Sequence, residues 1–410
     1  MIGGGIGGLA CAQGLARRGL DVRVVERDSD LSVTGGYKLH LGVPAVAALR
    51  EMLPPTLVEA LLGSAVGTRG FSLAVRDHRG RQLLRAAESS NGLTLDVDRI
   101  TLRRLLALGL EDRLLLGRSC QRWRLEGQTV FAELDDGSEV EADVLVIADG
   151  AGSRLAEQLA GRPTSSPCGL VGVAGRTALQ SLPHSTRTLL GEGPMLAIGP
   201  GGTGLFATAH DPVGRAAVRT CLATAATRSP IAIWGLIAVE GGLPPDLMRL
   251  DPPSLVKACT QLLQRQFWAD RIVSLLTCSE VPTVSAYRLN AADPDDLAPW
   301  PSSRVTAVGD AVHAMPPTGG QGAATAILDA HALVQQLHAA AQGDLTTVVA
   351  VHDYETRLRV HAGQTVRESL QPVRWIRATA TPGGAIAVRA LTPVLALGAA
   401  AVHTVARSRR

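Results

Sequence analysis

The chain has 410 residues, of which 46% are hydrophobic and 19% charged, and its formal net charge is +3. This balance excludes a disordered or fibrous protein, and also a dedicated nucleic-acid binder, which needs a larger basic excess. At roughly 150 residues per domain, the length predicts two or three domains. The lysines are Lys38 and Lys257, and neither follows a glycine, so the chain lacks the P-loop of nucleotide triphosphatases.

The chain opens on the glycine-rich motif Gly3-x-Gly5-x-x-Gly8. This spacing matches the dinucleotide fingerprint, whose glycines permit a tight turn, close approach of a pyrophosphate to a helix N-terminus, and close helix-on-strand packing. The apolar pattern predicts a helix directly after the motif, then a buried strand from Asp21 to Glu26. The carboxylate of Glu26 lies eighteen residues after the third glycine, where it suits ribose hydroxyls, and Arg27 stands beside it.

The strand that should precede this fingerprint is too short in the sequence. Such a strand has about five or six residues and is central in a doubly wound sheet, but Met1 and Ile2 are the residues available. A missing central strand would leave both neighbouring strands with unpaired backbone groups. We therefore expect a few apolar residues to precede Met1 in the native protein.

Local patterns predict further elements before residue 110. Pro44 suits the first turn of a helix that reaches about Met52. Residues 70–98 have the pattern of short strands. Asp98 is a predicted cap for a helix that runs from Arg99 to about Leu108.

Two later stretches each place an aspartate next to a glycine at the end of a buried strand. The first strand, 144–147, is followed by Asp149 and Gly150, and the second, 305–308, by Gly309 and Asp310. Open α/β sheets bind ligands at such strand ends. The second stretch continues into a Pro-Pro pair, glycines and a helix N-terminus, which suits a polyol hydroxyl and negative charge on a ring.

The remaining patterns divide the chain between sheet and helix. Residues 165–290 are rich in Gly, Pro and Thr with short apolar runs, and predict a sheet-rich second domain. Two long helices are expected, from about Gly322 to Ala341 and from about Leu345 to Leu370. The apolar stretch from Ala390 to Ala406 is short for a membrane span, so we expect a terminal helix packed on the domain, with a helix lying on a membrane surface as the alternative.

The cysteines and the first residues bear on the compartment. Six cysteines are scattered, the closest pair being Cys259 and Cys278, 19 residues apart, so the chain has no CxxC metal or redox pair. The first residues lack the charged and apolar regions of a secretory signal. Reduced thiols in a cytoplasmic protein are the expectation.

The three glycine-aspartate motifs, in this order and spacing, resemble those of the FAD-dependent aromatic-hydroxylase-type monooxygenases, whose prototype is para-hydroxybenzoate hydroxylase. The chain is most similar to the salicylate-hydroxylase-like and polyketide-tailoring branch, from Gly3 to about residue 370. The resemblance implies an α/β fold in which a Rossmann-like FAD-binding domain is interleaved with a smaller sheet-rich substrate domain. The implied boundaries are residues 1–69, 96–165 and 290–385 for the FAD-binding domain, 70–95 and 166–289 for the substrate domain, and 386–410 for a C-terminal helix or tail.

The resemblance also implies roles for single residues. The glycine motif would hold the FAD pyrophosphate, Glu26 the adenosine ribose and Asp310 the ribityl chain. The loop from Pro316 to Gly322 would lie against the flavin ring, and Asp149 would contact both FAD and NAD(P)H. The implied cofactor-binding residues are Gly3, Gly5, Gly8, Glu26, Arg27, Arg99, Asp149, Asp310, Gly320 and Gly322.

The sequence departs from the family pattern at two positions. Ala156 stands where the family usually has an arginine that bears on nicotinamide handling, with Arg154 nearby. Ala324 stands where the family usually has an asparagine, which removes one side-chain hydrogen bond near the flavin and keeps the backbone N–H groups.

The implied reaction is NAD(P)H-driven hydroxylation of an aromatic or polyketide-like small molecule, in which a flavin hydroperoxide formed with O2 transfers one oxygen atom. We expect neither a nucleic-acid partner nor association with a membrane. The sequence does not select a catalytic acid or base among His40, His210 and His313. Three aromatic residues are candidates to line a substrate cavity, although apolar core is the more frequent role for such residues: Trp234, Phe206 and Tyr287.

Other functions remain open from the sequence. A flavin epoxidase, oxidase or reductase would use the same scaffold. A flavin-binding protein with little turnover is suggested by Ala156, Ala324 and the short start. A dehydrogenase that uses nicotinamide alone is disfavoured, because it would not need Asp310 and its loop. Substrate identity, the choice between NADH and NADPH, and oligomeric state do not follow from the sequence.

Overall fold

The computed structural model describes residues 1–32, 38–68, 71–88, 91–191, 193–211, 229–381, 383–384 and 386. The terminal helix or tail expected over 386–410 therefore lies outside the described residues, apart from Ile386. Within the described residues, no helix combines the length and apolar character needed to cross a membrane.

A parallel sheet forms the centre of the FAD-binding part, as the Rossmann-like fold requires. It contains β1 (Val24–Glu26) paired with β7 (Leu114–Leu116), and β11 (Leu145–Ile147) paired with β17 (Val305–Ala307). Ile2 forms parallel bridges to both Val25 and Ile147 and so joins the two pairs.

The backbone of the first three residues thus occupies the central position of the sheet. Ile2 N donates to Val146 O at 2.9 Å, Ala148 N donates to Ile2 O at 2.7 Å, and Gly3 N donates to Val25 O at 2.8 Å. The residues from Met1 to Gly3 therefore already bond to the strands on both sides. That further residues precede Met1 in the native protein stays a prediction.

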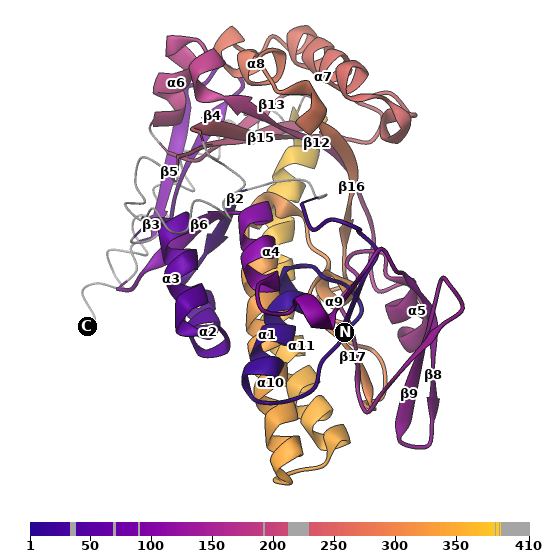
Figure 1. Ribbon diagram of the computed structural model, residues 1–410. Coiled ribbons are helices and arrows are strands. Elements are labelled where there is room, and N and C mark those ends of the chain that lie inside the picture. The colour runs from indigo at the N-terminus through magenta and orange to yellow at the C-terminus, as the bar shows by residue number, and fades with distance from the viewer. Residues whose placement is uncertain are drawn as a thin grey trace, which may run out of the picture.

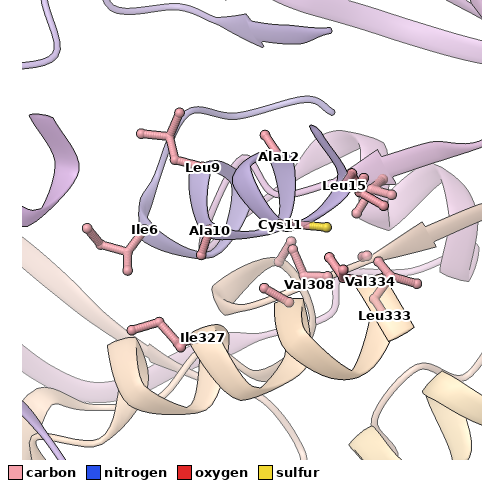
Figure 2. Close-up of a cluster of buried hydrophobic side chains, with 14 of the residues drawn as sticks. Ile6, Leu9, Ala10, Cys11, Ala12, Leu15, Val308, Ile327, Leu333 and Val334 are labelled. Carbon is pink, nitrogen blue, oxygen red and sulfur yellow. The ribbon is translucent and has the colours of Figure 1, made fainter. Parts of the chain in front are cut away.

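Three helices cover this sheet and pack on one another. They are α1 (Ile6–Arg17), α10 (Gly322–Gln342) and α11 (Thr347–Ala378), and α10 lies between the other two. Figure 2 shows Ile6 and Ala10 of α1 on the side that faces α10 and its Ile327, whereas Leu9 points away from α10 into another part of the same core. Tyr354 of α11 donates its hydroxyl to Ala307 O at 2.8 Å, which fixes α11 on the last strand of the sheet.

The second part of the protein is a seven-stranded sheet with the strand order β16-β12-β15-β14-β13-β4-β5. Its neighbours are antiparallel except for the parallel pair β13 and β4. Helices α6, α7 and α8 cover one face, and Figure 1 shows them together above the sheet. The strands are β4 (Phe71–Asp77), β5 (Gln82–Glu88), β12 (Ser166–Ala178), β13 (Met195–Gly199), β14 (Thr203–His210), β15 (Ile231–Val239) and β16 (Ser285–Ala291), and the helices are α6 (His184–Gly191), α7 (Pro252–Arg265) and α8 (Asp270–Thr277).

Two smaller sheets complete the fold. One consists of β2 (Lys38–Leu41), β6 (Thr94–Asp98) and β3 (Val66–Thr68), with β6 in the middle. The other is an antiparallel meander that the sequence did not predict. Its strands are β8 (Cys120–Glu126), β9 (Thr129–Leu134) and β10 (Glu139–Ala142). The helices not yet named are α2 (Val43–Met52), α3 (Pro55–Ser64), α4 (Arg99–Ala107), α5 (Arg154–Ala160) and α9 (Asp310–His313).

The mixed α/β fold class is confirmed, and several element predictions need correction. The strand predicted from Asp21 is shorter and begins at Val24. The stretch 165–290 is not all sheet, since it contributes α6, α7 and α8 to the covering layer. The last helix continues past the predicted end at Leu370 as far as Ala378. Helix α4 begins at Arg99 as predicted, and Asp98 caps it by accepting from Thr101 N at 2.9 Å.

Candidate functional site

The glycine motif forms a turn, and its three glycines differ in how much space surrounds them. Gly3 has φ +108°, and a Cβ here would overlap Ala148 O. A Cβ at Gly8 would overlap Gly3 O, so this position sets the close approach of α1 to the strand. Gly5 differs, because a Cβ here would meet no described atom within 4 Å.

Gly5 is also the N-cap of α1, and among the described residues no side chain caps this helix end. The first N–H groups of a helix lack internal partners, and they attract anions together with the helix dipole. Open space above Gly5 and free N–H groups below it form a cradle that a pyrophosphate would fit. This observation, made on the chain itself, supports a dinucleotide at the turn.

Glu26 lies beside this turn and is 6% exposed. Its Oε2 accepts from Gly4 N at 2.5 Å and lies 3.2 Å from a guanidinium nitrogen of Arg103, while its Oε1 accepts from Asp28 N at 2.8 Å. An ionised carboxylate offers about four acceptor positions. Three are used here, which leaves room for a single ribose hydroxyl.

Arg103 is a site residue that the sequence reasoning missed. It is 5% exposed on α4, donates to Gly4 O at 2.7 Å and also contacts Asp28 Oδ2 at 2.9 Å. It therefore ties the glycine turn to the end of β1. A signal was present, because residue 103 lies four positions after Arg99 and so faces the same side of α4.

Asp149 follows β11 and lies next to the glycine turn. Its Oδ1 is buried and has no hydrogen-bond partner among the described residues. Burial raises the pKa of this carboxyl, against the effects of a hydrogen bond from Ser153 and the charge of Arg27. Arg27 itself is exposed. An unpaired buried acceptor beside the cradle is a position where a ligand hydroxyl gains a hydrogen bond.

Asp310 lies at the carboxyl end of β17, as the first residue of α9. The surrounding protein desolvates its carboxyl group and raises the pKa, against the charges of His313 and Arg99. Asp310 is nevertheless exposed. A carboxylate that neighbouring protein desolvates and that is still accessible can be reached by a hydroxyl-bearing ligand. Arg99, half-buried at the start of α4, contributes positive charge to the same place.

The loop from Pro316 to Gly322 leads from Asp310 into α10. Gly320 is exposed with φ +65°, and Gly322 lies so that its Cβ would stand 3.7 Å from Asp310 Oδ1. Thr318 donates to Ser369 O of α11 at 2.6 Å, which holds the loop in place. In the described part of the chain, no side chain caps α10, so its first N–H groups are available to an anionic ligand.

Behind the loop, His313 is fully buried and pairs with Asp329 of α10 through Nε2 and Oδ2 at 2.5 Å. Burial lowers the pKa of His313, but the charge and hydrogen bond of Asp329, with the charge of Asp310, raise it overall. Asp329 also accepts from Gly309 N at 3.2 Å. This pair fixes the strand end that presents Asp310, and it is a second feature absent from the sequence reasoning.

The seven-stranded sheet separates the aromatic candidates by face. Trp234 is fully buried under α6–α8, in the core on the far side of the sheet. The opposite face, which we call the inner face, carries Arg176, Phe206, Thr208 and His210, because residues two apart on a strand and cross-strand partners share a face. Trp234 therefore belongs to the core. On the inner face Phe206 is half-buried, and the aromatic ring of Tyr287 lies over Gly172.

The two departures from the family pattern differ in their surroundings. Ala156 is fully buried, and its N–H donates to Ser153 Oγ at 2.9 Å at the start of α5. An arginine here would have to enter the core. Arg154 is exposed at the same helix end. Ala324 is half-buried in the first turn of α10, where its backbone N–H remains.

Comparisons with known proteins give two family matches. Residues 277–369 match the model described as FAD binding domain, and residues 1–209, just over half of the chain, match the model described as pyridine nucleotide-disulphide oxidoreductase. The second matched range contains the glycine turn, Glu26 and Asp149 described above.

The individual relatives are more specific. The dual O-methyltransferase/FAD-dependent monooxygenase CTB3 of Cercospora beticola is 28% identical over 90% of this chain and 45% of its own length. A solved structure of a putative FAD-containing monooxygenase from Photorhabdus luminescens aligns with a TM-score of 0.76 and 28% identity, over 91% of this chain and 96% of that one. The chain therefore carries an FAD-binding domain, and its homologues are FAD-dependent monooxygenases.

FAD is accordingly the cofactor of this chain, and the recognition of the family from its three motifs is confirmed. The chloroplastic zeaxanthin epoxidase of Nicotiana plumbaginifolia is another relative, 26% identical over 88% of this chain and 52% of its own length. The chain spans about half the length of these curated relatives. Their activities and substrates are therefore properties of longer proteins.

Proposed function

We propose that this monooxygenase catalyses the NAD(P)H-driven hydroxylation of a small aromatic or polyketide-like molecule with O2. The observation that carries the proposal is the parallel placement of two uncapped helix N-termini. Gly7 and Gly14 of α1 lie against Ala326 and Val334 of α10, so both helices run in the same direction. Both positive helix ends therefore face the region of Asp310 and the glycine turn.

In this proposal each end of the cofactor meets a group that suits it. The open cradle at Gly5 takes the pyrophosphate, and Glu26 takes one hydroxyl of the adenosine ribose. Asp310 binds the ribityl chain with Arg99 beside it, and Asp149 offers its unpaired Oδ1. The loop containing Gly320 and the N–H groups that follow Gly322 lie along the ring, where they stabilise negative charge on the reduced form. Gly3 and Gly8 give the turn its shape, and Arg27, exposed after β1, lies beside the adenosine ribose.

When bound, FAD supplies the redox chemistry, since it passes electrons from NAD(P)H to O2 and delivers one oxygen atom to the substrate. The protein holds the substrate and keeps water away from the reacting atoms. The part of the inner face that carries Phe206 and Tyr287 provides aromatic surface for the first task. The buried pair His313 and Asp329 keeps Asp310 in position.

The test is an assay of the purified chain with added FAD. We expect a yellow protein that oxidises NAD(P)H faster when aromatic or polyketide compounds are present. A product that gains one oxygen atom, labelled when the reaction is run under 18O2, would establish hydroxylation. A protein that remains colourless with excess FAD would overturn the proposal, and so would NAD(P)H oxidation that yields hydrogen peroxide alone with every compound.

An epoxidase is the second candidate, because zeaxanthin epoxidases are among the relatives over most of this chain. Product analysis separates the two functions. Epoxidation adds oxygen across a carbon–carbon double bond without forming a phenol, and its product is opened to a diol by acid.

A further inference from the structure

A cluster of charged side chains joins the small sheet of β2, β6 and β3 to the inner face of the large sheet. Lys38 Nζ lies 2.8 Å from Asp96 Oδ2 and donates to Thr208 Oγ1 at 3.2 Å. Arg176 of β12 lies 3.0 Å from Asp98 Oδ2. The cluster is close to the flavin region, because Asp98 precedes Arg99, the residue whose charge acts on Asp310.

His210 lies at the end of β14 within this cluster. It is 1% exposed, and neither ring nitrogen has a hydrogen-bond partner among the residues that the structure describes. Burial lowers the pKa of His210 to about 4, with Lys38 adding to the effect and Asp98 opposing it. The imidazole is therefore neutral near pH 7, with one N–H donor and one acceptor.

Buried polar groups without partners are rare in native proteins, and they are destabilising. His210 has two such atoms in one ring, on the sheet face that meets the FAD-binding part. His313 differs, because its Nε2 bonds to Asp329 and only its Nδ1 lacks a partner among the described residues. The unused donor and acceptor of His210 instead match a group that arrives from outside the chain.

The charges around His210 limit the kind of group that can arrive. Within the described residues of the cluster, Lys38 is paired with Asp96, and Arg176 with Asp98. Asp96 also accepts from His40 Nδ1 at 2.8 Å. A carboxylate ligand would need an uncompensated cation here. Phe206 and Ile233 on the same face add apolar surface.

We propose that His210 is a specificity-determining residue, which binds a neutral hydroxyl or carbonyl group of the substrate and selects against aromatic compounds that carry a carboxylate. The inference rests on the proposed function and names a residue that sets its specificity. Because the ring of His210 is shielded from solvent, the substrate displaces the side chains that cover it. The ring then gains the partner it lacks, which favours substrates that carry such a group over bare hydrocarbons.

The test uses the FAD-loaded enzyme and two matched probes, 1-naphthol and 1-hydroxy-2-naphthoate, whose binding is followed by the change in flavin absorbance. We expect the wild type to bind 1-naphthol more tightly than the carboxylate. His210→Leu should weaken 1-naphthol binding about 10-fold, the effect of one buried hydrogen bond. His210→Gln retains a donor and an acceptor and should stay within about 3-fold of wild type.

Trp234→Phe is the control, because Trp234 also carries a buried ring nitrogen without a described partner but lies on the opposite face. It should leave 1-naphthol binding unchanged. Flavin content and the thermal midpoint without ligand show whether each variant folds, and His210→Leu should not lower that midpoint, since it removes unpaired polar atoms.

Equal binding of 1-naphthol by wild type and His210→Leu would overturn the inference, as would tighter binding of the carboxylate or no response to 1-naphthol. In each of these cases bound FAD and NAD(P)H oxidation would leave the proposed function standing. A protein without bound flavin would instead overturn the proposed function.

Discussion

Gly7 of α1 lies against Ala326 of α10, and a Cβ at Gly7 would stand 3.2 Å from the Ala326 Cβ. This contact brings together the first turns of two parallel helices that begin 316 positions apart in the chain. Figure 2 shows how closely α1 packs on α10 around Ile6 and Ile327. Because both helix starts are uncapped by described side chains, the contact concentrates two positive helix ends in one region.

Alanine substitutions at Gly5 and Gly8 should have different effects, the first on FAD binding and the second on stability. Gly5→Ala should leave stability near wild type, because Gly5 has φ −76° and open space around a Cβ. It should weaken FAD binding about 10-fold or more, since the methyl group occupies the cradle. Gly8→Ala, whose methyl would overlap Gly3 O, should instead destabilise the fold. Thermal unfolding of the FAD-free protein and a titration with FAD measure the two effects, and equal FAD affinity for Gly5→Ala and wild type would contradict the assignment.

Arg103→Leu should destabilise the protein by about 3–5 kcal/mol, because it leaves the buried carboxylate of Glu26 without its cation. The neighbouring Arg104 is exposed on the same helix and gives a matched control. Arg104→Leu should change the free energy of unfolding by about 0.5 kcal/mol or less. Urea unfolding of both variants measures the difference, and similar values would show that Arg103 contributes no more than a surface arginine.

Asp310→Asn should have opposite effects on folding and on cofactor binding. A carboxyl whose pKa is raised in the fold favours its protonated form, so its ionised form opposes folding above the ordinary pKa of 3.8. The FAD-free variant should therefore unfold at a higher temperature than wild type at neutral pH. Its affinity for FAD should fall about 10-fold, the effect of losing a hydrogen bond to a charged group.

Asp344→Asn, at the exposed far end of α10, is the control for this change and should alter neither property. A fall in the unfolding temperature of Asp310→Asn would show that the carboxylate stabilises the fold in the absence of cofactor.

The pair of His313 and Asp329 predicts a pH-dependent stability. Because the folded pKa of His313 is raised above 6.5, the stabilisation from the charged pair is complete below pH 6.5 and is lost as the pH rises through the folded pKa. Asp329→Asn removes the charge that stabilises the imidazolium, so the stability of this variant should fall less than that of the wild type as the pH rises. Thermal midpoints of the two proteins measured from about pH 5 to pH 9 test this.

The ion pair of His331 and Glu51 at the surface is the control for the buried pair, with His331 Nε2 and Glu51 Oε2 2.7 Å apart. Glu51→Gln should hardly change the pH profile, because exposed ion pairs contribute little. Identical profiles for wild type and Asp329→Asn would contradict the role of the buried pair.

Local chemistry explains how much of the site could be predicted. The spacing of Gly3, Gly5 and Gly8 and the carboxylates of Asp149 and Asp310 at strand ends are short-range patterns, and they indicated FAD and the monooxygenase family. The cap of α4 by Asp98 was equally local. The roles of these residues toward the cofactor stay predictions, for which the open cradle and the accessible carboxylate are supporting observations.

The sequence by itself determined the fold class, the cofactor and the family, because a turn, a strand end and a helix start are set by residues close together in the chain. Only the tertiary structure decided which side chains meet across large separations. It placed Lys38 against Thr208, 170 positions away, and it separated Trp234 in the core from Phe206 on the inner face. The burial of His210 among paired charges depends on how two sheets pack, and packing depends on the whole chain at once.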